Sequence, residues 1–163
     1  MKLVFLFFIF ISSIVSAQNM NIEKLGEIIT KNSDSLEVKN NTWKFIHKDR
    51  ILICIADKKA NRMRIISPIA KKEQLTEELI LNSLVANFHT ALDVKYALSD
   101  ERLWSVFTHP LKELTTHQVE DAISQVYYAN LTFGTLFSST SLTFPGNTKK
   151  KELQKSIPLK EKI

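Results

Sequence analysis

The 163-residue sequence predicts an α+β fold in which an antiparallel five-stranded sheet packs on helices, in the order α-βββ-α-ββ-α. Three segments carry apolar residues at helical spacing, and each begins near side chains that favour a helix amino terminus. Five shorter segments are alternating or continuously apolar and end at polar turns, which is typical of strands joined as hairpins. We expect a single domain over residues 18–144.

The first predicted helix follows a cap at Asn19 or Asn21, carries apolar residues at helical spacing from Ile22, and ends near Asn32. Residues 33–41 are polar and rich in turn formers. Within them, only the alternation of Leu36 and Val38 points to a short strand.

Three strands are predicted next, over residues 42–47, 50–56 and 62–68. Short polar turns join them, which indicates an antiparallel meander. The strand over 50–56 is apolar on both faces, so we expect it to be central and covered on two sides.

A second helix is predicted over residues 71–90, with acidic side chains in its first turns and apolar residues around most of its circumference. Such a helix is either deeply buried or shares its second face with a partner. Alternation over 93–99 and an apolar run over 103–108 predict a second hairpin. Thr115 and Gln118 have the spacing of a capping box and predict the start of the third helix.

Residues 1–17 have the pattern of a secretory signal peptide, with Lys2 before an apolar run and Val15-Ser16-Ala17 at its end. A membrane anchor is the alternative, but the run is shorter than the ~20 residues that a spanning helix needs. We therefore expect cleavage after Ala17 and an exported protein, in the periplasm or secreted.

The second hairpin and the helix after it resemble a known superfamily. Residues 94–106 (VKYALSDERLWSV), then Leu111, Leu114 and a capped helix from Val119, are similar to the YbjN-like and type III secretion chaperone-like (Tir chaperone-like) superfamily. The resemblance covers residues 20–137 and rests on hydrophobic patterns and turns. It implies a chaperone-like fold without catalytic residues, whose secretion-chaperone members bind segments of partner proteins, often as dimers. Those members are cytosolic, whereas this chain carries an export signal.

The net charge of +5 lies at the ends of the chain. Residues 18–144 hold 15 basic and 15 acidic side chains, whereas residues 145–163 hold six lysines and two glutamates. We expect a solvated, disordered tail; the alternative is contact with anionic lipid or envelope polymers through Lys149, Lys150 and Lys151. The neutral domain disfavours a nucleic-acid partner.

The sequence contains few candidates for catalysis or metal binding. Cys54 lies within an apolar strand, where a thiol is usually an inert small hydrophobe. No two of the four histidines have the i, i+4 spacing of a helical metal pair, and the adjacent acidic pairs suit helix surfaces. We expect no metal, no cofactor and no enzymatic activity, while an enzyme with an unrecognised site remains an alternative.

Trp43, Phe45 and Trp104 are the candidate partner-binding residues, because tryptophan and other aromatic side chains dominate binding hot spots. The alternative is that they are ordinary core residues of half-buried strands. The leading hypothesis is a noncatalytic exported homodimer that binds a protein or peptide partner in the cell envelope. We expect the three aromatic side chains near a groove or a sheet edge.

Overall fold

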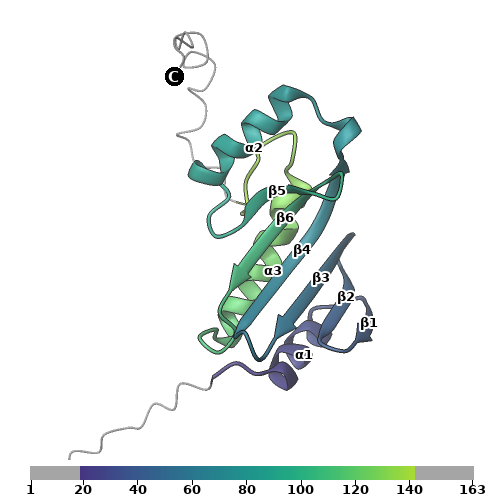
Figure 1. Ribbon diagram of the computed structural model, residues 1–163, viewed down its shortest axis with the longest axis vertical. Helices are drawn as coiled ribbons and strands as arrows, with labels where there is room; N and C mark the ends of the chain where they lie inside the picture. Colours follow the sequence, from purple (N-terminus) through teal and green to yellow (C-terminus); the bar gives the residue numbers. More distant parts are fainter. Residues whose placement is uncertain (1–18, 142–163) are drawn as a thin grey trace, which may run out of the picture.

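The structure is a computed structural model that describes residues 19–141, so the predicted signal peptide and the basic tail at 145–163 lie outside the described residues. Within that range, three α-helices, one short 3-10 helix and six strands make up the domain (Figure 1). In chain order they are α1 (Ile22–Lys31), β1 (Ser35–Lys39), β2 (Thr42–His47), β3 (Arg50–Asp57), β4 (Arg62–Lys71), η1 (Lys72–Gln74), α2 (Glu77–His89), β5 (Lys95–Ser99), β6 (Arg102–His109) and α3 (Thr116–Leu131).

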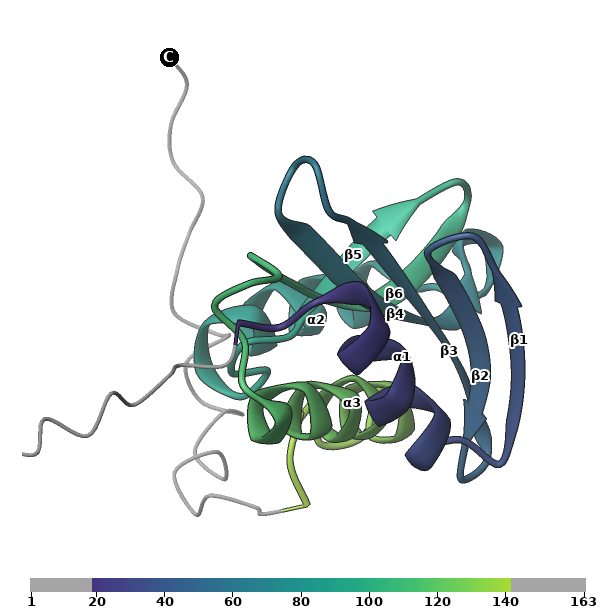
Figure 2. The same ribbon diagram turned by 90° about the horizontal axis from the view of Figure 1, so that it is seen from below.

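The six strands form one antiparallel sheet in the order β1-β2-β3-β4-β6-β5. Helices α1 and α3 lie against one face of the sheet, whereas α2 packs next to the edge strand β5 (Figure 2). The predicted α+β class is confirmed. The expectation of five strands is wrong by one, because Ser35–Lys39 pairs with β2 along its whole length.

Local capping signals place the ends of α1 and α3 where the sequence predicts them. Asn21 Oδ1 accepts a hydrogen bond from Lys24 N at 2.8 Å, which starts α1. Thr115 and Gln118 form the expected capping box before α3, with distances of 2.8 and 3.2 Å.

The start of α2 differs from the predicted helix over 71–90. Strand β4 continues to Lys71, which still pairs with Arg102 of β6. The chain then forms η1 and leaves helical geometry at Leu75. The helix begins only after Thr76, whose hydroxyl accepts a hydrogen bond from Leu79 N at 3.2 Å. The predicted helix over 71–90 therefore begins six residues before the observed helix.

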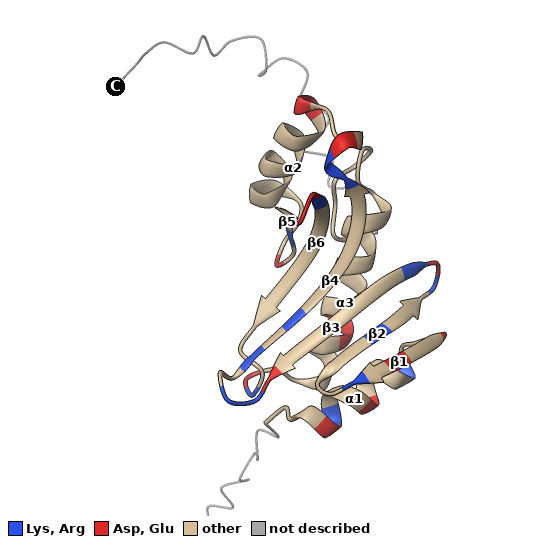
Figure 3. Cartoon of the chain, turned by 45° about the vertical axis from the view of Figure 1, so that its right-hand side comes forward, with Lys and Arg blue, Asp and Glu red and all other residues tan. Residues whose placement is uncertain are grey.

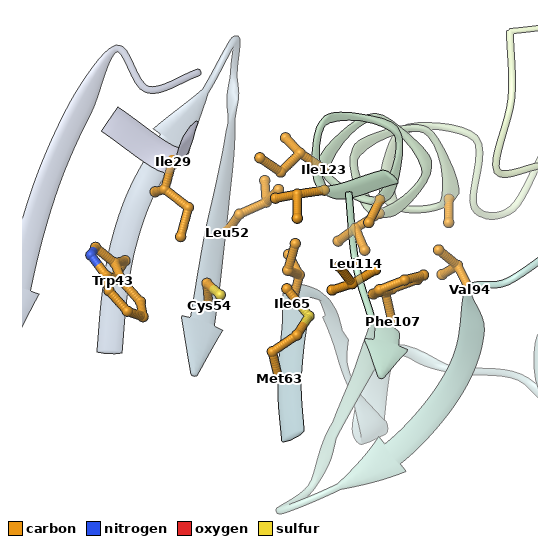
Figure 4. Close-up of a cluster of buried hydrophobic side chains, with 14 of the residues drawn as sticks. Ile29, Trp43, Leu52, Cys54, Met63, Ile65, Val94, Phe107, Leu114 and Ile123 are labelled. Carbon is orange, nitrogen blue, oxygen red and sulfur yellow. The ribbon is translucent and has the colours of Figure 1, made fainter. Parts of the chain in front are cut away.

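The inward side chains of the sheet form one hydrophobic core with α1 and α3 (Figure 4). Strand β3 supplies Leu52 and Cys54, and β4 supplies Ile65, all with no exposed surface. Ile29 of α1 and Ile123 of α3 meet them from the helical layer. Each such aliphatic side chain contributes about 1.5–3 kcal/mol when it is fully buried.

The backbone pairing between β3 and β4 ends at Ile53 and Ile66, the last pair in their ladder. There, Ser67 Oγ donates to the carbonyl oxygen of Ile51 at 2.7 Å. Asn130 of α3 in turn donates to Ser67 Oγ at 2.7 Å. Side-chain hydrogen bonds thus continue the connection between the two strands and tie it to α3.

Candidate functional site

The second face of the sheet is apolar and has no layer of helices over it. Both α1 and α3 lie on the opposite side, and no other element within residues 19–141 covers β2, β3 and β4 (Figure 2). Ile46, Ile51 and Ile55 are consequently 39%, 44% and 43% exposed. We call this surface the open face; its apolar side chains are Ile46, Ile51, Ile53, Ile55, Ile66, Pro68, Trp104 and Val106.

Cross-strand pairing makes the open face continuous. Ile53 of β3 pairs with Ile66 of β4, and Ile66 pairs with Val106 of β6. Ile46 pairs with Ile51 on the adjacent strands β2 and β3. Neighbouring side chains in such pairs are close enough to form one patch, and large apolar patches on a protein surface commonly mark interaction sites.

The expectation that β3 is covered on two sides is wrong for the single chain. Leu52 and Cys54 are buried beneath the helices, but Ile51 and Ile55 point away from them. The physical reason is the layer arrangement: α3 fills the space beside α1 rather than crossing to the other face.

The three predicted aromatic residues do not share one surface. Trp43 and Phe45 point into the core and are 5% and 1% exposed. A Cβ atom on Gly26 of α1 would lie 3.3 Å from Trp43 Nε1, which shows how closely the helix covers the indole. Trp104 instead lies on the open face, where its Nε1 donates to the carbonyl oxygen of Ser99 at 3.1 Å. Only Trp104 is placed where a partner can reach it, and its role in binding stays a prediction.

Helix α2 presents a second unpartnered apolar surface. Leu81, Leu84 and Phe88 lie at helical spacing and are 51%, 59% and 86% exposed. The fully buried residues of the same helix are small, Ser83 and Ala86, and Leu79 is partly buried against the core. The helix is therefore not deeply buried in the single chain, and sharing its second face with a partner stays a prediction.

The reactive side chains are dispersed. Burial raises the pKa of the Cys54 thiol, so the thiol stays protonated and unreactive. His47 Nδ1 lies 2.8 Å from the carbonyl oxygen of Asn32, and His109 Nδ1 lies 2.8 Å from that of Pro110. In the described part of the chain, no group of three or more His, Cys, Asp or Glu side chains is arranged to hold a metal ion.

A polar depression lies where β4 meets the β5–β6 turn. Its walls contain cations and anions together, and Lys72 Nζ and Glu101 Oε2 form an ion pair at 3.2 Å. Because cations and anions lie side by side and pair with one another, the depression favours neither an anionic nor a cationic ligand. It is lined by Lys71, Lys72, Glu73, Asp100, Glu101 and Arg102.

The outward isoleucines of β3 are the surface residues that sequence reasoning did not select. Their signal was present as the uninterrupted apolar run over 50–56. Such a run predicts a strand buried on both sides, because periodicity does not show whether an apolar face is covered within the chain.

Between residues 19 and 141, no helix is long and apolar enough to cross a membrane.

Comparison with solved structures supports the fold. A chain in the structure of the HopA1–SchA chaperone–effector complex is similar, with a TM-score of 0.53 and 11% sequence identity. The similarity covers 67% of this chain and 88% of that chain. No protein-family model matches the sequence, and no curated protein matches it. The arrangement of three helices and an antiparallel sheet is therefore similar to the fold of a chain in a chaperone–effector complex.

Proposed function

We propose that the protein is a noncatalytic, exported binding module that holds a segment of a partner protein in the cell envelope. The observation that carries the proposal is the open face, a continuous apolar surface spanning β2, β3, β4 and β6. Burying such a surface against a partner removes apolar area from water, which favours association. The similar solved structure is a chaperone–effector complex, so a chain with this fold binds a protein there.

A noncatalytic role is supported by the positions of the reactive groups. Cys54 is inaccessible in the core, and the ring nitrogens of His47 and His109 face backbone carbonyls. Nucleophilic catalysis requires a nucleophile and a base within hydrogen-bond reach of each other, and neither histidine is so placed with Cys54.

Export follows from the signal-peptide pattern of residues 1–17. An exported binding module differs from secretion chaperones in the compartment where it meets its partner. Mass spectrometry of the amino terminus of protein isolated from its native host tests this part of the proposal. We expect the chain to begin at Gln18; a retained Met1 in a membrane fraction would indicate an anchor instead.

Helix α2 supports the proposed homodimer. Its exposed stripe of Leu81, Leu84 and Phe88 is self-complementary in chemistry, and a twofold axis would bring two copies of the stripe together. Light scattering of the mature protein should give the mass of a dimer, and Leu84→Asp with Phe88→Asp should give a monomer. Leu131→Asp, at an exposed leucine of α3, is the matched control. A wild-type monomer at high micromolar concentration would contradict the dimer.

Site-specific photo-crosslinking in the native host tests partner binding. A photoreactive amino acid in place of Ile55 lies on the open face, whereas one in place of Glu27 lies on the exposed side of α1. We expect a discrete crosslinked protein from position 55 and none from position 27. Equal yields from both positions, or an adduct from position 27 alone, would contradict the open face as the binding site.

A further inference from the structure

We propose that the open face recognises a protein segment that combines aliphatic with acidic side chains. This inference rests on the proposed function and adds the chemistry of the partner to it. It follows from the way charge is distributed over a domain that is neutral as a whole.

Basic side chains are concentrated on the outward side of the sheet. Residues 18–144 contain equal numbers of basic and acidic side chains. The outward positions of the six strands, however, hold seven basic residues and only two acidic ones, and bands of positive charge cross β2 and β4 (Figure 3). The basic residues are Lys39, Lys44, Arg62, Arg64, Lys71, Lys95 and Arg102, and the acidic residues are Glu37 and Asp57.

Two arginines of β4 form no ion pair with another residue between 19 and 141, although Asp57 stands opposite Arg62 in the β3–β4 ladder. Arg62 donates to the carbonyl oxygen of Asn61 at 3.2 Å, and Arg64 Nε donates to Thr108 Oγ1 at 3.3 Å. They stand two residues apart on β4, on the same side of the sheet, so their like charges repel. An acidic ligand would relieve that repulsion and accept guanidinium hydrogen bonds.

The other outward cations differ in availability. The ammonium group of Lys95 donates to the carbonyl oxygen of Asn87 at 3.1 Å and is thereby bound to the end of α2. Lys44 Nζ lies 3.9 Å from Glu37 Oε2, a long and exposed contact that stabilises little. Lys71 Nζ lies 3.4 Å from Glu73 Oε1. Arg62, Arg64 and Lys44 are therefore among the outward cations that a ligand can engage.

These cations lie beside the aliphatic rows. Arg64 pairs across the ladder with Ile55, and its strand neighbour on the same face is Ile66. Lys44 pairs with Ile53. A bound segment thus meets aliphatic and cationic groups at adjacent positions, which requires aliphatic and acidic side chains to alternate on its own surface.

Isoleucine and valine dominate the open face, which favours a protein over other anionic partners. Single-stranded nucleic acids are held by stacking on aromatic side chains, and Trp104 is the one aromatic residue among the apolar side chains of this face. Insertion into a membrane would carry the guanidinium of Arg64 below the headgroups together with Ile55 and Ile66, at a cost in desolvation.

Peptide display tests the inference without knowledge of the partner. The probe is a library of random dodecapeptides selected on the mature protein, followed by sequencing of the enriched pool. The same selection is run on Arg62→Gln/Arg64→Gln and on Lys58→Gln/Lys59→Gln. The second variant removes the same charge from the β3–β4 turn and serves as the matched control. A parallel arm measures binding to phosphatidylglycerol vesicles.

We expect enrichment of aliphatic together with acidic residues on the wild type and on the lysine control. On the arginine variant, the acidic preference should disappear while the aliphatic preference stays, and wild-type-selected peptides should bind it about tenfold more weakly, or ~1.4 kcal/mol. Enriched peptides without an acidic excess would overturn the inference but leave the proposed function intact. Peptides that bind Ile55→Ser as well as they bind the wild type would overturn both. Vesicle binding without peptide enrichment would replace the protein partner with a lipid surface.

Discussion

The side-chain amide of Asn87 in α2 forms hydrogen bonds with both the backbone N–H and the carbonyl of Tyr96 in the edge strand β5. Its Oδ1 accepts from Tyr96 N at 2.7 Å, and its Nδ2 donates to the carbonyl oxygen of Tyr96 at 3.2 Å. One side-chain amide thus takes the place of the next strand beside β5. This contact fixes α2 against the sheet while leaving the open face and the exposed stripe of α2 free.

Removal of the Asn87 side chain should destabilise the domain. Asn87→Ala leaves the N–H and carbonyl of Tyr96 without their partner, which costs about 1–3 kcal/mol in the free energy of unfolding. Chemical denaturation measures the change, and Asn82→Ala on the same helix is the control for helix propensity. Equal effects of the two substitutions would show that the bond to Tyr96 contributes no stability.

Asn130 should stabilise the junction of β3, β4 and α3. Its Nδ2 donates to Ser67 Oγ and to the carbonyl oxygen of Pro68 at 2.7 and 2.8 Å, and its Oδ1 accepts from Arg50 Nε at 3.1 Å. Asn130→Ala is expected to lower the free energy of unfolding by roughly 1–3 kcal/mol. Ser124→Ala on the same helix provides the comparison by urea denaturation, and an equally small effect of both would contradict this role.

Cys54 should be chemically silent in the folded protein. Because burial raises the pKa of its thiol, a disulfide reagent at pH 8 should react only after denaturant is added. Cys54→Ser places a hydroxyl in the apolar core and should cost about 1–3 kcal/mol, whereas Cys54→Ala should cost less. Fast labelling of the native protein would contradict the buried position, and complete loss of partner binding in a folded Cys54→Ala variant would contradict a structural role.

Substitutions of the two tryptophans should have different effects, on stability for Trp43 and on partner binding for Trp104. Trp43→Ala removes a side chain beneath α1 and should destabilise the domain by about 3–5 kcal/mol. Trp104→Ala should lower stability less and weaken capture of the crosslinked partner, because Trp104 lies on the open face. Unchanged affinity of a folded Trp104→Ala variant would place the binding surface elsewhere.

Local signals in the sequence predicted most of the fold. Asn21 and Thr115 cap α1 and α3 as expected, because a cap depends only on residues within one turn. The start of α2 was not predictable in the same way. The pairing of Lys71 with Arg102 keeps the beginning of the predicted helix in strand β4, and local sequence does not reveal this contact because the two residues are far apart in the chain. Strand β1 is missing from the predicted five-stranded sheet because it is short and carries polar residues at its outward positions.

The site was harder to predict than the fold. Alternation shows that Trp43 and Phe45 share a face of β2, but it does not show which face the helices cover. The same limitation applies to Ile53 and Ile55 of β3. Their apolar side chains look the same in the sequence whether the open face is covered or exposed. Only the placement of α1 and α3 on one side distinguishes core aromatic residues from surface isoleucines.

Isoleucine methyl NMR tests the central claim most directly, because the isoleucines divide by face. The open face carries Ile46, Ile51, Ile53, Ile55 and Ile66. The core between the sheet and the helices contains Ile28, Ile29, Ile65 and Ile123. Addition of a selected peptide, or of the segment recovered by crosslinking, should shift the methyl signals of the open-face isoleucines and leave the buried set nearly unchanged. Shifts confined to Ile80 of α2, or to Ile28 and Ile29, would contradict binding on the open face.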